Sequence, residues 1–294
     1  MVARNTRLDP KLVKLLLDFV SQKSSIIERK ANGGYYIKDQ DNYSRVFWHN
    51  LEKYVGAYGP CLEALKDGSA SMKKVHAAVD RSILAMSYAR CEFPSNPMLA
   101  DILFQNRIHN LLDIGCGTAS LLVTLGVRDK NFLGWGLDLN KEMCRLARNR
   151  IHQAGLAKRI RIIHGDGRHA SQFVPDPMVK RIAALSASSI LNSFLGGKRN
   201  NRAISFLSSL KQRFPNRLLF VADYYGKLGS SSSRADHCPE TMVHDLVQAI
   251  SGQGIPPPSL RGWLQIYRGA DCKLLHAVEG RNNGIDWFIH VVEL

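Results

Sequence analysis

A glycine-rich turn within Leu111–Ser120 has the residue types and spacing of a binding site. An apolar run leads through Asp113 to Gly115 and Gly117, and Leu121–Val123 continues with helical character. A strand, a tight glycine turn and a helix form a crevice at the carboxyl end of a parallel strand, where nucleotides bind in open α/β sheets. The two glycines also allow backbone conformations that other residues resist and let a ligand approach the main chain closely. The stretch therefore predicts a nucleotide-binding turn.

Further acidic residues narrow the ligand that this turn would hold. Asp138 ends the apolar run Phe132–Leu137, about twenty residues after Gly117, where an acidic residue grips a ribose diol. Asp113 places negative charge where a dinucleotide would need a pyrophosphate seat, and this charge suits a cationic ligand instead. Asp166, at the end of the next strand, adds a contact to a nucleoside. The pattern favours a positively charged nucleoside over a dinucleotide.

A second set of chemistry-bearing residues lies near the C-terminus. His244 and Asp245 occur together in an otherwise apolar helix, and His290 lies inside an apolar strand. Imidazoles and a carboxylate suit a divalent metal or iron centre that binds substrate. Alternatively, His244 and Asp245 are a capping or surface pair and His290 is a core histidine. The residues alone leave both interpretations open.

Alternating strands and helices must position these residues. From residue 111 onward the alternation predicts βαβ units with a parallel sheet, closed by a C-terminal hairpin. The expected strands are 111–114, 132–137, 160–164, 182–186, 218–223, 272–278 and 285–292, and the expected helices are 141–154, 199–213, 239–251 and 260–267.

We expect residues 1–95 to form a separate helical region and residues 96–294 to form the domain that contains the sheet. Asp9-Pro10 begins an apolar helix through residue 23 that suits dimerisation. With the glycine turn at Gly33-Gly34 it looks like the last helix and wing of an abbreviated winged helix. Apolar residues at spacings of three and four between 47 and 58 predict one inward helix face, and 71–90 predict another helix.

Composition limits the class of protein. The 294 residues are 45% hydrophobic and 22% charged, without a run long enough to span a membrane or a signal peptide. Six scattered cysteines predict reduced thiols and a cytoplasmic protein. The net charge of +15 is spread along the chain, so we expect a solvated basic surface and not a nucleic-acid partner.

Three motifs resemble those of class I S-adenosylmethionine-dependent methyltransferases: Asp113–Ala119, Gly136–Asp138 and Gly165–Gly167. The resemblance implies a Rossmann-like seven-stranded sheet with helices on both faces, with S-adenosylmethionine as cofactor. It implies cofactor-binding roles for Asp113, Gly115, Gly117, Asp138, Leu139, Gly165, Asp166, Gly167 and Ser186. Two departures are Ala119 in place of a third glycine and Asn192 in a segment where related O-methyltransferases often carry a histidine.

The stretch Val243–Gly254, with the late His290, further resembles metal-dependent α-keto acid C-methyltransferases. That likeness implies a metal, divalent or iron, on His244, Asp245 and His290, and methylation of the β-carbon of an α-keto acid. Candidate catalytic residues are His244, Asp245 and Tyr225. A metal-independent O- or N-methyltransferase of a small metabolite is the alternative, with a histidine as general base. A methyl-donor-binding regulator associated with DNA is the third hypothesis. For either enzyme we expect a small-molecule substrate and a homodimer.

Overall fold

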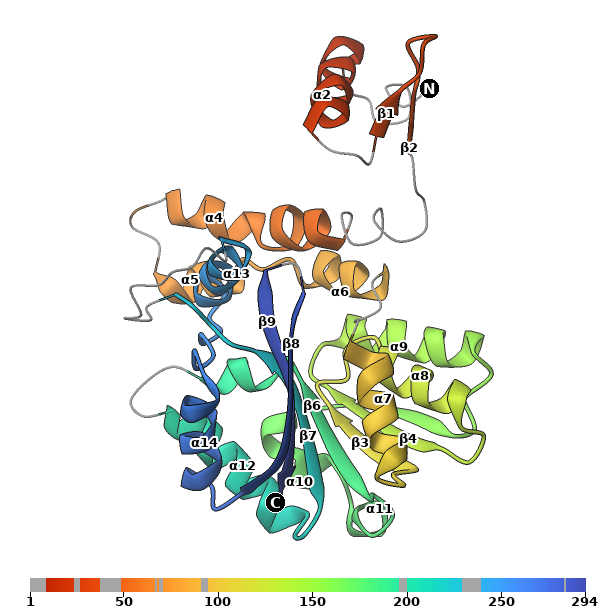
Figure 1. The fold of residues 1–294 in the computed structure, drawn as a ribbon, viewed down its shortest axis with the longest axis vertical. Helices are drawn as coiled ribbons and strands as arrows, with labels where there is room; N and C mark the ends of the chain where they lie inside the picture. The colour runs from red at the N-terminus through yellow and green to blue at the C-terminus, as the bar shows by residue number, and fades with distance from the viewer. Residues whose placement is uncertain are drawn as a thin grey trace.

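A seven-stranded sheet forms the centre of the computed structural model (Figure 1), which describes residues 9–23, 27–37, 49–66, 68, 71–90, 95–195, 200–228, 239–282 and 284–294. In spatial order the strands are β5 (Ile160–His164), β4 (Leu133–Asp138), β3 (Asn110–Ile114), β6 (Ala184–Ser188), β7 (Leu218–Tyr224), β9 (Ile285–Glu293) and β8 (Lys273–Asn282). The first five run parallel, and β9 is antiparallel to both β7 and β8. The predicted α/β fold with a final hairpin is confirmed.

The fourth strand lies two residues later than its predicted range of 182–186. Ala184 is the first residue of β6 in register with β3, opposite Leu111, while Ile182 packs below the strand in the core. The shift matters because it carries Ser188 to the carboxyl edge of the sheet, beside Ala222 of β7.

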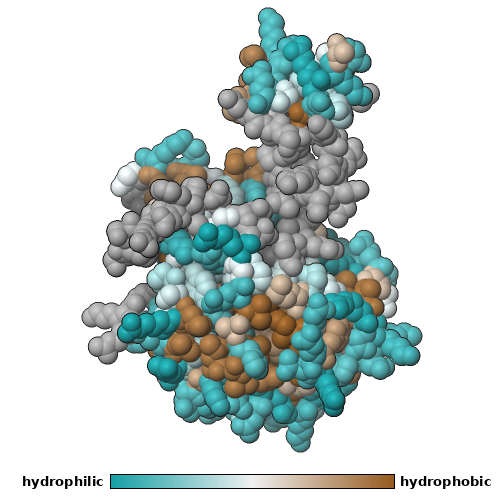
Figure 2. Space-filling view, in the orientation of Figure 1, coloured by the Kyte–Doolittle hydropathy of each residue, from teal (hydrophilic) through white to brown (hydrophobic). Residues whose placement is uncertain are grey.

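Helices cover both faces of the sheet and bury a core on each. On one face lie α7 (Ser95–Gln105), α8 (Ser120–Arg128) and α9 (Lys141–Gln153), and on the other α10 (Ala170–Phe173), α11 (Asp176–Val179), α12 (Asn201–Arg213) and α14 (Leu260–Gly269). Alternate side chains of one strand enter different cores, as Leu111 and Leu112 of β3 do. Figure 2 shows apolar residues gathering over the middle of the visible face, with hydrophilic residues around them.

A group of helices lies over the carboxyl ends of the strands (Figure 1). It comprises η1 (Leu51–Ala57), α4 (Gly59–Lys66), α5 (Met72–Ala77), α6 (Arg81–Arg90) and α13 (Pro239–Ile250). The first four come from the N-terminal region and α13 from the far end of the chain. This group of helices therefore joins segments almost 200 residues apart. α7 begins at Ser95, close to the predicted domain boundary, and that division stays a prediction.

The predicted single helix over 71–90 is wrong, because two caps divide it. Ser71 accepts a hydrogen bond from the Lys74 amide at the start of α5, which ends six residues later. Asp80 Oδ1 then accepts from the amides of Ser82 and Ile83, so a new helix starts there as α6.

The predicted inward face between residues 47 and 58 is also altered. Residues 47 and 48 lie outside the described ranges, and η1 is a π-helix in which the Tyr58 amide donates to the Lys53 carbonyl, five residues back. This wider turn rotates the helix surface relative to an α-helix. Val55, predicted inside, is 65% exposed, whereas Lys53 is only 7% exposed.

The N-terminal helix and hairpin form as predicted. α2 (Pro10–Lys23) precedes the antiparallel pair β1 (Ile27–Arg29) and β2 (Tyr35–Ile37), and the Tyr35 hydroxyl donates to Asp18 of α2 at 2.6 Å. Several apolar side chains of α2 are exposed on the protomer, namely Leu12, Leu15, Leu16 and Phe19. Dimerisation through this helix stays a prediction. In the described part of the chain no helix is both long and apolar enough to cross a membrane.

Candidate functional site

The turn between β3 and α8 has the backbone geometry that its glycines predict. Gly115 and Gly117 adopt φ values of +71° and +52°. A Cβ on Gly115 would lie 2.6 Å from Ile190 Cδ1, so the position excludes a side chain by strain and by space. Ala119, the departure from a third glycine, has φ of +59° with a buried methyl group. The left-handed conformation of an alanine costs about 1 kcal/mol, which the fold accommodates here.

Asp138 is held at the end of β4 by backbone amides. Its Oδ2 accepts from the Gly117 N–H and its Oδ1 from the Asn140 N–H, both at 2.8 Å. The carboxylate therefore braces the glycine turn, and its remaining lone pairs are available to hydroxyl donors. Burial raises the pKa of Asp138, and the two amide bonds oppose that rise.

Asp113 is a buried carboxylate of β3 beside the same turn. It is 4% exposed and accepts a 2.7 Å hydrogen bond from the Ser186 hydroxyl of β6. Burial raises the pKa of Asp113 to about 7, an effect that the Ser186 bond partly offsets. The ion pairs of the described residues include none with Asp113. A buried carboxylate without a cation favours a cationic ligand.

The other predicted cofactor residues surround this turn. Gly165 donates its N–H to the Asp138 carbonyl at 2.9 Å, and Gly167 is buried against Ile114. Asp166 is partly exposed and paired with the Arg168 guanidinium at 2.5 Å, which lowers its pKa. The side chain of Leu139 is exposed directly after Asp138. The fold thus brings the predicted set to one edge of the sheet, and the cofactor contact of each member stays a prediction.

Asp245 anchors α13 to the segment that follows β7. The Tyr224 hydroxyl donates to Asp245 Oδ1 at 2.8 Å, and the amides of Lys227 and Leu228 donate to Oδ2 at 2.6 and 2.8 Å. The side chain is fully buried. These three donors give Asp245 a positioning role, since it fixes where α13 meets the end of β7.

His244, its neighbour on α13, lies in a polar cluster under η1. Its Nδ1 is 2.8 Å from the Tyr54 hydroxyl and its Nε2 is 3.1 Å from the Gln248 amide nitrogen. The Tyr224 ring lies edge-on to the imidazole, with centroids 4.9 Å apart. Burial lowers the pKa of His244 to about 3, and the charge of Lys53 acts in the same direction. The imidazole is therefore neutral at neutral pH.

Lys53 contributes a buried positive charge to the cluster. Its Nζ lies 5.3 Å from the Tyr54 ring centroid and 5.4 Å from that of Tyr88. His49 packs against Tyr88 with ring centroids 5.3 Å apart. Burial lowers the pKa of His49 to about 4, with Lys53 acting in the same sense. The cluster thus contains one cation and two neutral imidazoles.

The polar cluster, formed by His49, Lys53, Tyr54, Tyr88 and His244, is connected to the glycine turn (Gly115–Gly117) through α6. Thr118, the residue after Gly117, donates its hydroxyl to the Tyr88 carbonyl at 3.5 Å and accepts from Arg150 of α9 at 3.0 Å. Arg150 also bonds the carbonyl of Ala89. The segment that carries the Tyr88 ring is therefore tied to the glycine turn.

The structure does not support the predicted metal site of His244, Asp245 and His290. Both ring nitrogens of His290 have partners of their own, Tyr267 at 2.9 Å from Nδ1 and Tyr225 at 3.3 Å from Nε2. His244 and Asp245 have different hydrogen-bond partners, since adjacent helix residues point in different directions. Nowhere in the described ranges do three or more His, Cys, Asp or Glu side chains gather as a metal site would require. His244, Asp245 and His290 therefore do not form the predicted site for a divalent metal or iron.

Tyr225, a predicted catalytic residue, also faces away from the His244 cluster. Its hydroxyl donates to Glu279 and its ring packs on Phe288, which stacks on His290 at 3.8 Å. The neighbouring Tyr224 is the tyrosine that meets His244 and Asp245. A catalytic role for Tyr225 stays a prediction without a contact to the cluster.

Sequence reasoning missed Lys53, Tyr54 and Tyr88 as site residues. Their positions depend on the π-helical turn and on the break before α6, neither of which hydrophobic spacing reveals. The signal in the sequence that could have indicated a site was a single lysine, Lys53, in a predicted helix with several aromatic residues. Asn192, where related enzymes often carry a histidine, is buried and its carbonyl accepts the Gly254 amide.

Comparison with known proteins agrees with this geometry. A family model described as a methyltransferase domain matches residues 111–192, from β3 through the end of β6 and the turn beyond. No curated protein matches the chain.

Several solved structures share the fold at low identity. Mitomycin 7-O-methyltransferase is 14% identical, with a TM-score of 0.68 over 99% of this chain and 86% of that one. An O-methyltransferase from neocarzinostatin biosynthesis, in complex with S-adenosylmethionine and 2-hydroxy-5-methyl naphthoic acid, is 14% identical, with a TM-score of 0.60 over 100% and 88%. N,N-8-amino-8-demethyl-D-riboflavin dimethyltransferase from Streptomyces davawensis is 15% identical, with a TM-score of 0.60 over 99% and 87%.

These likenesses show the methyltransferase fold, and the family match places a methyltransferase domain at 111–192. By this match the chain contains a methyltransferase domain, in agreement with the glycine turn between β3 and α8.

Proposed function

We propose that this protein transfers a methyl group from S-adenosylmethionine to an oxygen of a small molecule. The observation that carries the proposal is the buried cluster of Tyr54, Tyr224 and His244 beside the glycine turn. The cluster offers hydroxyl and imidazole groups for acid–base chemistry. Two of the three compared enzymes are named as O-methyltransferases and the third as an N,N-dimethyltransferase, which supports a heteroatom acceptor.

The residues around the turn fit the cofactor. Asp113 offers a buried negative charge to a cationic group, and Asp138 offers carboxylate oxygens to ribose hydroxyls. Leu139 exposes an apolar side chain beside Asp138, where it would cover the adenine. S-adenosylmethionine supplies an electrophilic methyl group on a sulfonium, and the acceptor loses a proton in the exchange.

His244 is the residue we propose to receive that proton. Its ring is neutral, and the Tyr54 hydroxyl at Nδ1 is the contact through which the proton would reach it. Gln248 and Tyr54 hold the ring in orientation from both nitrogens. Because Asp245 is committed to three donors, its removal should act on stability and position and not on proton transfer.

A labelled methyl donor tests the proposal against a panel of phenols, amines and α-keto acids, with products identified by mass spectrometry. We expect methyl ethers, formed equally well after treatment with a chelator. His244→Ala should lower kcat by about 100-fold or more and leave the affinity for S-adenosylhomocysteine unchanged. Metal-dependent label on the β-carbon of a keto acid would overturn the proposal, and so would label on nitrogen alone.

The C-methylation of an α-keto acid predicted from the resemblance is not our proposal, since it depends on a metal site that the side chains do not form. The DNA-associated regulator rests only on α2 and its hairpin. A gel-shift series over increasing salt tests it, because phosphate contacts make DNA binding steeply salt-dependent. We propose a homodimer formed through the exposed apolar residues of α2.

A further inference from the structure

Lys53 is a buried cation for which the described residues offer no anion. Its side chain is 93% buried, and none of the ion pairs among the described residues involves it. Lysine is rarely buried without a partner, because removing an ammonium from water costs several kcal/mol. The uncompensated charge at this place therefore needs an explanation.

The groups that face Lys53 are neutral. Two tyrosine rings lie against its Nζ, those of Tyr54 and Tyr88. The imidazoles of His49 and His244 are close enough for the ammonium to lower the pKa of each. A ring face attracts a cation by about 2 kcal/mol or less, so the two rings offset only part of the burial cost.

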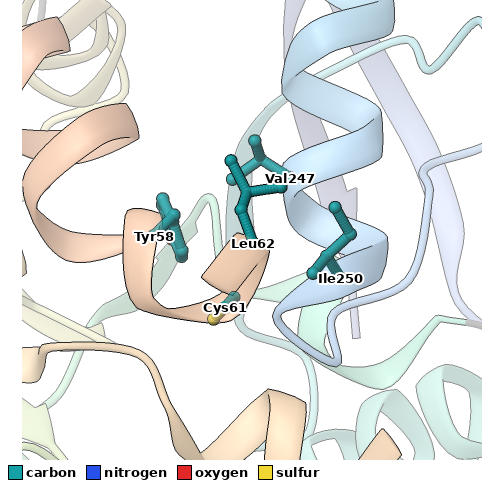
Figure 3. Close-up of a pocket in the computed structure, with 5 residues that line it drawn as sticks. All are labelled: Tyr58, Cys61, Leu62, Val247 and Ile250. Atoms are coloured by element: carbon teal, nitrogen blue, oxygen red, sulfur yellow. The ribbon is translucent and has the colours of Figure 1, made fainter. Parts of the chain in front are cut away.

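An apolar pocket lies one helical turn along the same helices. It is lined by Tyr58 at the end of η1, by Cys61 and Leu62 of α4, and by Val247 and Ile250 of α13 (Figure 3). Tyr58 comes four residues after Tyr54, and Val247 comes three after His244. The contact between these helices is thus polar and cationic at one end and apolar at the other.

We propose that Lys53 forms an anion-binding subsite that selects aromatic methyl acceptors carrying an anionic oxygen, either a carboxylate or the phenolate that takes the methyl group. This inference rests on the proposed function, because the subsite lies beside the cofactor turn through Tyr88 and Thr118. An anion beside Lys53 would supply the missing counter-charge. A carboxylate there would also weaken the repulsion that opposes protonation of His244, and an acceptor phenol would give its proton to His244 as its phenolate forms beside Lys53.

Binding measurements on the full chain saturated with S-adenosylhomocysteine test the proposal. The probes are 1-naphthoic acid for the carboxylate, 4-nitrophenol at pH 8 for the phenolate, and 1-naphthol as a neutral aromatic. Wild-type protein should bind at least one anionic probe about tenfold or more tightly than 1-naphthol. Lys53→Met should abolish that preference, Lys53→Arg should retain most of it, and Lys73→Met, at an exposed lysine, should change nothing.

Thermal unfolding separates a binding lysine from a structural one. A buried charge without a partner destabilises the free protein, so Lys53→Met should raise its Tm by about 2 °C or more. A lysine that held the fold together through a partner would give a lower Tm on substitution. A fall in Tm overturns the inference.

Equal affinity for anionic and neutral probes overturns the inference, and so does an unchanged preference in Lys53→Met. If S-adenosylhomocysteine binds and methyl transfer proceeds in either case, only the anion subsite fails and the proposed function stands. If S-adenosylhomocysteine does not bind the wild-type protein at all, the proposed function fails with it.

Discussion

Cofactor binding should weaken steeply as the pH falls below 7, because Asp113 must be ionised to hold a cation. Burial raises the pKa of this carboxyl to about 7, although Ser186 donates to it at 2.7 Å. The positive charge of a bound cofactor favours the ionised form, so binding and deprotonation are coupled. Below pH 7 the free protein increasingly holds the neutral acid, and binding must displace its proton.

The size of the effect follows from the pKa. With a value near 7, the ionised fraction falls about 20-fold between pH 7.5 and pH 5.5, and the affinity for S-adenosylmethionine should fall by about the same factor. Isothermal titration calorimetry at constant ionic strength measures this directly. Asp113→Asn keeps the shape of the side chain and a partner for Ser186 but removes the charge. Its affinity at pH 7.5 should be about tenfold or more below that of the wild type and nearly independent of pH.

Two results would refute this reasoning. A wild-type affinity that is constant from pH 7.5 to pH 5.5 would show that Asp113 does not titrate on binding. A steep dependence retained in Asp113→Asn would assign the titration to another group, of which Asp138 is the first candidate because burial raises its pKa as well.

The remaining predictions concern stability, packing and assembly. Burial raises the pKa of the Asp223 carboxyl from 3.8 to about 7, and its Oδ2 has no partner among the described residues. The folded state therefore holds the carboxyl proton more tightly than the unfolded chain does. The protein loses stability as the pH rises from 3.8 to about 7. Asp223→Asn should therefore raise Tm more at pH 7.5 than at pH 5, recovering up to about 4 kcal/mol, and an equal shift at both pH values would contradict this. Asp245→Ala leaves buried donors unsatisfied and should lower the free energy of unfolding by about 3 kcal/mol, measured by urea titration, and a change below about 1 kcal/mol would argue against its anchoring role. Gly136→Ala places a Cβ 2.6 Å from a cysteine sulfur of the cofactor turn, so calorimetry should show weaker S-adenosylhomocysteine binding, and wild-type affinity would exclude this tight packing. Replacing both Leu15 and Phe19 by Lys should convert a dimer to a monomer in sedimentation experiments with little change in Tm, and an unaltered mass would show that α2 is not the interface.

The geometry of the glycine turn was predictable because it is local. The glycine turn and Asp138 depend on a few residues at short spacing, and one parallel strand pair brings them together. The strand–helix alternation was equally local, since each element has its own period and each period appears in a single window. The structure confirms the turn geometry and the strand–helix alternation, and the cofactor contacts stay a prediction.

The cluster around His244 was not predictable, because it depends on contacts between residues nearly 200 positions apart. Tyr54 and His244 meet across 190 residues, and no single window contains both. The histidines suggested a metal site because their types match metal ligands, but the fold gives each ring its own hydrogen-bond partners.

The sequence by itself determined the fold class, the order of strands and helices from residue 111 onward and the glycine turn, because short-range periodicity and glycine conformation govern these. Only the tertiary structure decided that His244 and His290 lie in different networks and that Lys53 points inward. A side chain's surroundings follow from the packing of distant helices and from the π-helical turn of η1. One lysine among many in a basic protein becomes distinctive only once its burial is known.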